Sequence, residues 1–79
     1  MKIPRDVNAR DLIKVLERYG YVLVRQEGSH IRMAKKEADK THKVTIPCHN
    51  PLKIGTIHKI AKEICTFSKL NTNDFYSQL

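Results

Sequence analysis

The sequence predicts an α+β domain: a helix, three antiparallel strands, a second helix and a short C-terminal helix, with the helices on one face of the sheet. Three observations predict it. Apolar residues recur at helical spacing near both ends of the chain. Three runs between them are rich in β-branched residues or alternate apolar with polar side chains, as strands do. The chain has 79 residues, which predicts one domain, residues 1–79.

The first helix is expected to begin after Asn8 and to end before Gly20. Asn8 is a favourable N-cap, and Asp11 follows three residues later. Gly20 stands where a left-handed residue would end the helix. Its apolar residues are at helical spacing: Leu12, Ile13, Val15, Leu16 and Tyr19.

Three strands are expected next, at residues 21–26, 29–35 and 42–46. We interpret Glu27 and Gly28 as the two-residue loop of the first hairpin. Residues 36–41 are charged and lack apolar anchors, so they are expected to form a mobile hairpin loop. Pro47 ends the third strand because proline has no backbone N–H to donate to a sheet.

The C-terminal part of the chain predicts two helices. The longer is expected over residues 53–66, and its apolar stripe is Ile54, Ile57, Ile60, Ala61 and Ile64. Asn71 or Thr72 is expected to cap a last short helix that runs to Leu79. The apolar residues of that helix are Phe75, Tyr76 and Leu79.

The first hairpin loop determines which side chains share a face of the sheet. With Glu27 and Gly28 in the loop, Arg25 faces His30 and Val24 faces Ile31. The face expected under the helices then carries Val22, Val24, Ile31, Met33, Val44 and Ile46. The face expected to be open carries Arg25, His30, Arg32, Lys43 and Thr45, with Tyr21 and Leu23 further along.

The charge of the chain favours a polyanionic partner. Fifteen Lys and Arg residues against eight Asp and Glu give a net charge of +7. On the open face, a phosphate backbone would meet the cations first and the imidazole of His30 at close range. The simpler alternative is that this face is polar only because it is solvated.

Other classes of protein are disfavoured. Cys48 and Cys65 are too few for a disulfide scaffold, and no spacing of metal ligands is present, so neither metal nor cofactor is expected. No apolar run approaches the length of a membrane span. No apolar run follows Met1–Asp6, which argues against a signal peptide and makes the cytoplasm the expected location.

Gly28-Ser29-His30 at the start of the second strand, in this order of elements, resembles the HicA toxin family. These are the small ribonuclease components of HicA–HicB toxin–antitoxin pairs. Further similarity lies in Gly20 before Tyr21-Val22, in Pro47-Cys48-His49, and in Leu52 followed by Gly55-Thr56-Ile57. Two departures stand beside it: Cys48 replaces the usual aliphatic residue, and the 36–41 loop lacks the family's common glycine.

The resemblance implies a fold like that of double-stranded-RNA-binding domains and metal-independent cleavage of mRNA that depends on His30. It also implies a HicB-type antitoxin that blocks this surface, so we expect a monomer when free and a hetero-oligomer with the antitoxin. His30 is then the candidate general base. The candidate RNA-binding residues are Arg25, Ser29, Arg32 and Lys43.

Several alternatives remain open from the sequence. His49 is a candidate general acid or a residue that orders its turn, whereas structural or solvated roles are expected for His42 and His58. Tyr21 and Leu23 are either covered by the terminal helix or part of an antitoxin-docking patch. The alternatives for the whole chain are a non-catalytic RNA-binding module and a protein-interaction domain.

Overall fold

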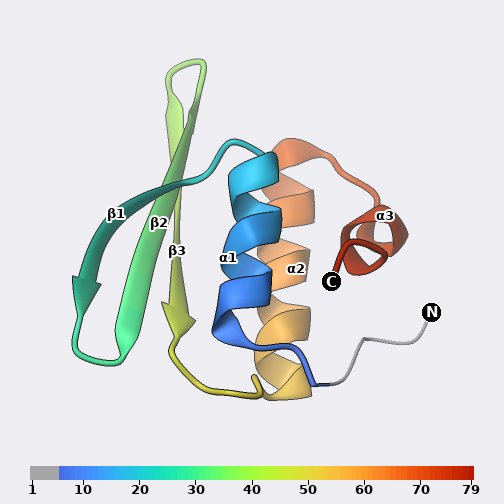
Figure 1. The fold of residues 1–79 in the computed structure, drawn as a ribbon. Helices are drawn as coiled ribbons and strands as arrows, with labels where there is room; N and C mark the ends of the chain where they lie inside the picture. The colour runs from blue at the N-terminus through green and yellow to red at the C-terminus, as the bar shows by residue number, and fades with distance from the viewer. Residues whose placement is uncertain (1–5) are drawn as a thin grey trace.

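The computed structural model describes residues 6–79, and its elements follow the predicted order (Figure 1). They are α1 (Ala9–Arg18), β1 (Val22–Glu27), β2 (His30–Glu37), β3 (Lys40–Pro47), α2 (Ile54–Ser68) and α3 (Thr72–Tyr76). The predicted α-β-β-β-α layout with a short C-terminal helix is therefore confirmed. The expectation about a signal peptide falls largely on residues 1–5, outside the described part.

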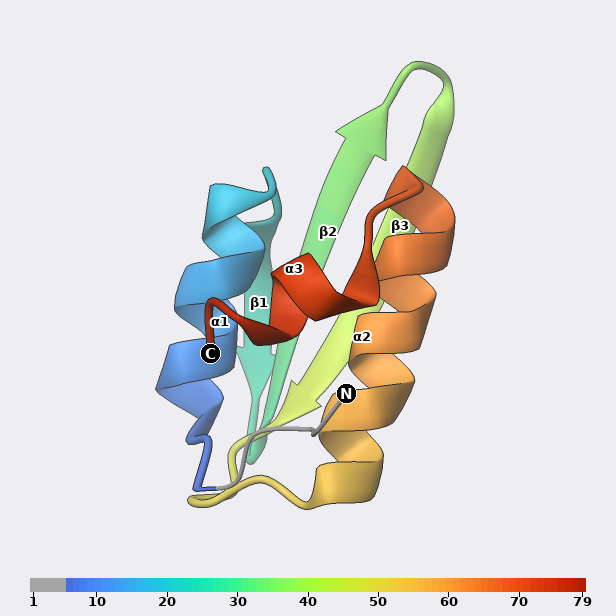
Figure 2. The ribbon, with the colours of Figure 1, turned by 90° about the vertical axis from the view of Figure 1, so that its right-hand side faces the viewer.

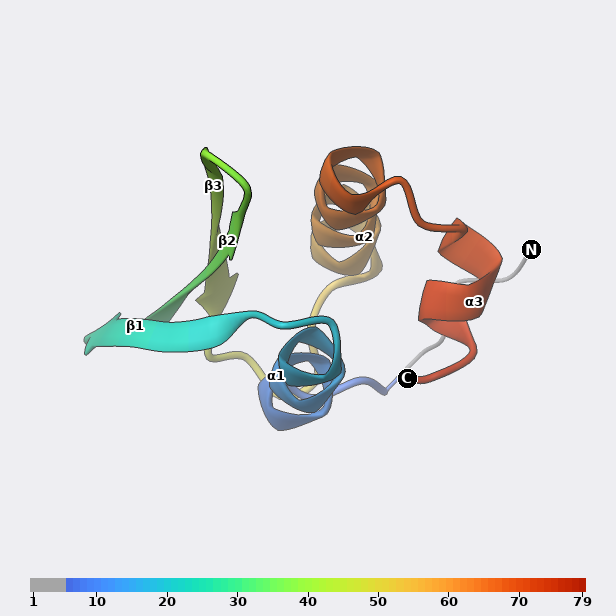
Figure 3. The ribbon, with the colours of Figure 1, turned by 90° about the horizontal axis from the view of Figure 1, so that it is seen from above.

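The elements form three layers. The antiparallel sheet has the order β1-β2-β3, so β1 and β3 are its edge strands. α1 and α2 lie side by side on one face of the sheet, as predicted (Figure 3). α3 crosses the opposite side of this helix pair, away from the sheet (Figures 2 and 3). No helix formed by residues 6–79 lies over the other face of the sheet.

The predicted signals at both ends of α1 are confirmed. The backbone N–H of Asn8 donates to the Asp11 carboxylate at 3.0 Å, which satisfies a donor at the start of the helix. Gly20 has φ +96°, a conformation that side chains rarely adopt. The chain then turns into β1, and the N–H of Tyr21 donates to the carbonyl of Leu16.

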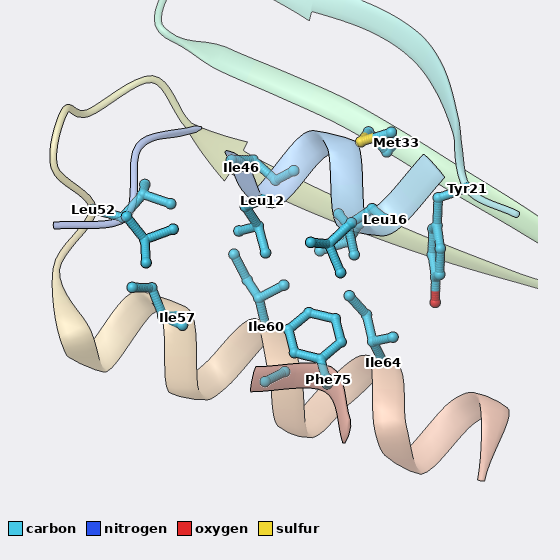
Figure 4. Close-up of a cluster of buried hydrophobic side chains, with 14 of the residues drawn as sticks. Leu12, Leu16, Tyr21, Met33, Ile46, Leu52, Ile57, Ile60, Ile64 and Phe75 are labelled. Atoms are coloured by element: carbon cyan, nitrogen blue, oxygen red, sulfur yellow. The ribbon is translucent and has the colours of Figure 1, made fainter. Parts of the chain in front are cut away.

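The core lies between the sheet and the helices (Figure 4). Met33 from β2 and Ile46 from β3 are fully buried against α1 and α2. Phe75 of α3 is buried as well, next to Ile60 and Ile64 of α2. Burial of apolar surface is the main favourable contribution to folding, and β1 itself supplies no buried residue to it.

The predicted loop of the first hairpin is wrong by one residue, so the predicted register is wrong as well. Gly28 and Ser29 form the turn, so Glu27 pairs with His30 and Arg25 with Arg32. Gly28 has φ +57°, as glycine at the first central position of a two-residue turn readily allows. A β-bulge between Leu23 and Arg25 then shifts the register again.

The prediction that Val22 and Val24 belong to the core is also wrong. Val22, Leu23 and Val24 are 61%, 59% and 58% exposed. β1 is the edge strand on the side of α1, and in Figure 3 it extends outward beyond the helix layer. Both faces of the strand therefore stay accessible, whichever way its side chains point.

Tyr21 is not on the open face, which corrects a further expectation. It is 1% exposed, and its hydroxyl and His42 Nδ1 are joined by a hydrogen bond of 2.6 Å. α3 does not cover Leu23, because it packs on the far side of the helix pair. There the ring of Phe75 stacks on Tyr19 with centroids 5.8 Å apart.

The remaining boundaries differ from prediction by a few residues. The second hairpin turns at Ala38 and Asp39, so most of the expected 36–41 loop belongs to β2 and β3. α2 reaches Ser68, beyond the predicted end, and α3 ends at Tyr76 rather than at Leu79. The side chain of Asn71 caps α3 by accepting from the N–H of Asn73 at 2.7 Å. Among residues 6–79, no helix is both long enough and apolar enough to cross a membrane.

Candidate functional site

His30 lies at the end of the sheet where the first hairpin turns. It is the first residue of β2 and is exposed. Glu27 of β1 is its partner on one side and Pro47 of β3 its partner on the other. Directly opposite residues in antiparallel strands share a face, so these three side chains form one row across the open face.

The next row on the same face is cationic. Arg32 is two residues from His30 on β2, which brings it to the same face about 7 Å along the strand. Its partners are Arg25 on β1 and Thr45 on β3. Lys43 lies one row further, opposite Ala34. The structure therefore brings Arg25, Arg32 and Lys43 to the face that carries His30, although the predicted pairing of Arg25 with His30 is wrong.

The three cations also line a hollow of the open face. Its volume is about 280 Å³. Arg25, Arg32 and Lys43 line it together with Thr45 and parts of Val24, Met33 and Val44. All three cationic side chains are exposed. This cluster can accept an anion on the surface, next to the row that contains His30.

Glu27 is a site residue that the sequence analysis missed. One of its carboxylate oxygens lies 3.2 Å from Nε of Arg25 and 3.6 Å from Nε of Arg32. It therefore lies beside both arginines and offsets part of their charge. The missed signal was Gly28-Ser29, a favourable two-residue turn, which moves Glu27 out of the loop and opposite His30.

A second hollow adjoins His30 at the free edge of β3. This groove has a volume of about 420 Å³ and runs between β3 and α2. Its lining from the sheet is His30, Lys43, Val44, Thr45 and Pro47, and its lining from α2 is Thr56, Lys59, Ile60 and Glu63. The α2 residues were missed as site residues, although their i, i+3, i+4, i+7 spacing marks one face of a helix.

Ser29 and His49 lie at the same end of the sheet as His30. Ser29 is exposed in the hairpin turn, and its carbonyl accepts from the N–H of Cys48 at 2.7 Å. This bond ties the turn to the segment that follows β3. His49 is exposed two residues after Pro47, and its N–H donates to the Pro47 carbonyl at 2.9 Å. The predicted roles of both residues remain predictions.

The other two histidines serve packing. His42 shares a hydrogen bond with Tyr21 and stacks on Phe67 with ring centroids 4.9 Å apart. His58 Nδ1 and the hydroxyl of Tyr76 are joined by a hydrogen bond of 3.4 Å, which links α2 to α3. Both agree with the structural roles expected for them. Among the described residues, no group of three or more His, Cys, Asp or Glu side chains could hold a metal ion.

Comparison with known protein families gives a match. Residues 9–64 match a protein-family model described as the HicA toxin of bacterial toxin–antitoxin systems. The match covers more than half of the chain and runs from α1 through most of α2, so it includes all of the open-face cluster. No curated protein and no solved structure matches the chain.

Proposed function

The chain belongs to the HicA toxin family, and from this we infer that it is a toxin that cleaves mRNA until a HicB-type antitoxin blocks it. One observation supports the catalytic part most directly. His30 is an exposed imidazole at the end of a strand, and two arginines lie in the next row of the same face. An exposed histidine in this setting is accessible to a bound phosphodiester.

RNA supplies its own nucleophile, so the chemistry demands little of the protein. In the proposed reaction, His30 takes the proton of a ribose 2′-hydroxyl, and the 2′-oxygen attacks the adjacent phosphorus. The bond from phosphorus to the 5′-oxygen breaks, and the leaving oxygen takes a proton. The products are a 2′,3′-cyclic phosphate and a 5′-hydroxyl. General base catalysis by His30 contributes about 10²–10⁴-fold in rate.

The cations of the open face hold the phosphate in this scheme. Arg25 and Arg32 are cross-strand partners that both contact Glu27, so one phosphate that shares or displaces Glu27 can reach both of them. They stabilise the negative charge that develops on the phosphoryl oxygens during attack. Lys43 and Ser29 extend the contact in the two directions along β2 and β3.

The proton for the leaving 5′-oxygen requires a general acid. His49 is the candidate, because it is exposed and follows Pro47, the β3 partner of His30. The Pro47-Cys48-His49 segment is also held against the hairpin turn through the bond between Ser29 and Cys48. We propose this role for His49 as secondary to that of His30.

The antitoxin is proposed to cover β1. Val22, Leu23 and Val24 form a contiguous exposed aliphatic segment on an edge strand, a combination that soluble proteins usually cover. β1 also carries Arg25 and Glu27, so a protein bound along it would block the open-face cluster. This replaces the expected patch of Tyr21 and Leu23, since Tyr21 is buried.

A non-catalytic RNA-binding module remains the second candidate. The observation that favours it is that Glu27 pairs with both arginines and offsets part of their charge beside His30. Such a module would bind RNA and leave it intact.

The chemistry of the cut ends tests the proposed function. Purified protein is incubated with a synthetic RNA in EDTA, and the ends of the products are mapped. The proposal predicts fragments with 2′,3′-cyclic phosphate and 5′-hydroxyl ends without added metal. Fragments with 5′-phosphate ends would overturn the chemistry, and intact RNA that is nevertheless bound would favour the binding module.

A further inference from the structure

The groove between β3 and α2 has a different character from the open face. Its floor is apolar, since Val44 and Ile60 are 4% and 3% exposed. Its rim is polar and exposed on both sides: His30, Lys43 and Thr45 on the sheet, and Lys59 and Glu63 on the helix, with the half-buried Thr56 between. An apolar floor under a polar, cationic rim suits a sugar or base with its phosphates at the margin.

The groove follows the free edge of β3 from Lys43 to Pro47. α2 begins soon after β3 ends and returns beside it in the opposite direction (Figures 1 and 2). His30 and Thr56 therefore lie toward one end, and Lys43 and Glu63 toward the other. The distance along β3 from Pro47 to Lys43 is about 13 Å, at roughly 3.3 Å per residue. That is longer than a single nucleotide.

The charges on the rim favour a phosphate-containing ligand. Two lysines face one carboxylate, and the carboxylate of Glu63 lies at the end away from His30. Lys59 is one turn after Thr56 on α2 and on the same helix face. A lysine and a threonine hydroxyl at this spacing can both donate to one phosphate.

We propose that this β3–α2 groove holds the sugar–phosphate backbone of the RNA strand beside the cleaved bond, with Lys59 binding a phosphate. The proposal rests on the proposed function. His30 lies where the open face and the groove meet, so the strand crosses the open-face arginines, passes His30 and continues over the edge of β3 toward α2.

Lys62 provides a matched control for Lys59. Both are exposed lysines on α2, three residues apart, but Lys62 does not line the groove. Lys59→Ala and Lys62→Ala remove the same charge from the same helix, so general effects of net charge on RNA binding are equal in the two variants. Lys59→Arg restores the positive charge at the groove.

The experiment measures binding of a 2′-O-methyl RNA, which cannot be cut, over a series of salt concentrations. Lys59→Ala is expected to weaken binding about tenfold and to lower the slope of log affinity against log salt by about 0.7. Lys62→Ala is expected to leave the slope unchanged, and Lys59→Arg to retain it. Thermal unfolding of each variant verifies that the fold is intact.

The outcomes separate this inference from the proposed function. If the wild-type protein binds and cleaves RNA but Lys59→Ala and Lys62→Ala behave alike, the groove is not the RNA path and the proposed function stands. If the wild-type protein neither binds nor cleaves RNA, both proposals fall. A loss confined to Lys59→Ala, with rescue by Lys59→Arg, supports the groove.

Discussion

Glu27 is the cross-strand partner of His30, and its carboxylate contacts Arg25 and Arg32 in the neighbouring row. The candidate base and the candidate phosphate-binding residues are therefore connected through one acidic side chain. The imidazole of His30 therefore has a carboxylate beside it as well as the two arginines of the next row. The relationship also means that a phosphate must share the two arginines with Glu27 or displace it.

The first prediction concerns that carboxylate. Glu27→Gln removes a negative charge from the proposed RNA surface and releases both arginines, so RNA affinity should rise and depend more steeply on salt. The free energy of unfolding should change by less than about 1 kcal/mol, because these ion pairs are on the surface. RNA titrations at several salt concentrations measure the first effect, and urea unfolding measures the second.

Glu17→Gln is the matched control, since it removes the same charge from an exposed position on α1. A smaller gain in affinity is expected for it. Equal gains in both variants would mean that only net charge matters. A loss of cleavage by Glu27→Gln with unchanged affinity would instead give Glu27 a direct part in the chemistry.

The second prediction concerns the buried hydroxyl of Tyr21. Tyr21→Phe removes its hydrogen bond to His42 and should lower the free energy of unfolding by about 1 kcal/mol at neutral pH. Burial raises the pKa of Tyr21 from 10.0 to about 12. Between these two values the unfolded chain ionises and the folded chain does not, so the wild-type protein should lose stability as the pH rises.

Tyr21→Phe should lack this part of the alkaline loss. Urea unfolding of both proteins at pH values from neutral to alkaline provides the comparison. An identical pH dependence in the variant would show that Tyr21 is not the group responsible.

The third prediction concerns the contribution of α3. Phe75 is fully buried and stacks on Tyr19, so Phe75→Ala should cost about 3–5 kcal/mol, a large share of the stability of a domain this small. Thr72→Ala, at an exposed position of the same helix, should change stability by less than about 0.5 kcal/mol. If both variants unfold at the same urea concentration as the wild-type protein, α3 is not part of the core.

The fourth prediction concerns the exposure of β1, which the sequence analysis expected to contribute to the core. Val24→Ala and Val44→Ala delete the same atoms from two strands of one sheet. Val44 is 4% exposed and its truncation should cost about 2 kcal/mol, whereas Val24 is 58% exposed and its truncation should cost under about 0.5 kcal/mol. Equal losses in the free energy of unfolding, measured with urea, would show that Val24 is part of the core.

The parts of the fold that local signals determine were predictable from the sequence. The bounds of α1 were predicted nearly to the residue, from the Asn8 cap, the left-handed Gly20 and the helical spacing of the apolar residues. Strand order followed from alternation and short connections. The prediction that His30, Arg32 and Lys43 share one face is also confirmed, because it depends only on alternation along β2 and on the pairing of β2 with β3.

The features that the sequence analysis missed depend on geometry that the alternation of apolar and polar residues does not encode. Choosing Glu27-Gly28 over Gly28-Ser29 as the turn displaced the pairing of β1 with β2 by two residues, and the bulge near Val24 then broke the alternation of β1. β1 looked like a core strand because Val22, Leu23 and Val24 are aliphatic. Whether a helix covers an edge strand is a tertiary property, and no helix of residues 6–79 buries a side chain of β1. The same holds for Lys59, which approaches His30 only because α2 packs beside β3.

The proposed function depends most on His30, and its removal is the most direct test. Wild-type protein and His30→Ala, purified identically, are incubated with the same RNA in EDTA, and the initial rates of cleavage are compared. The account predicts a rate lower by at least about 100-fold for the variant. Its free energy of unfolding should lie within about 0.5 kcal/mol of wild type, because the side chain is exposed. Cleavage by His30→Ala at the wild-type rate would contradict the account.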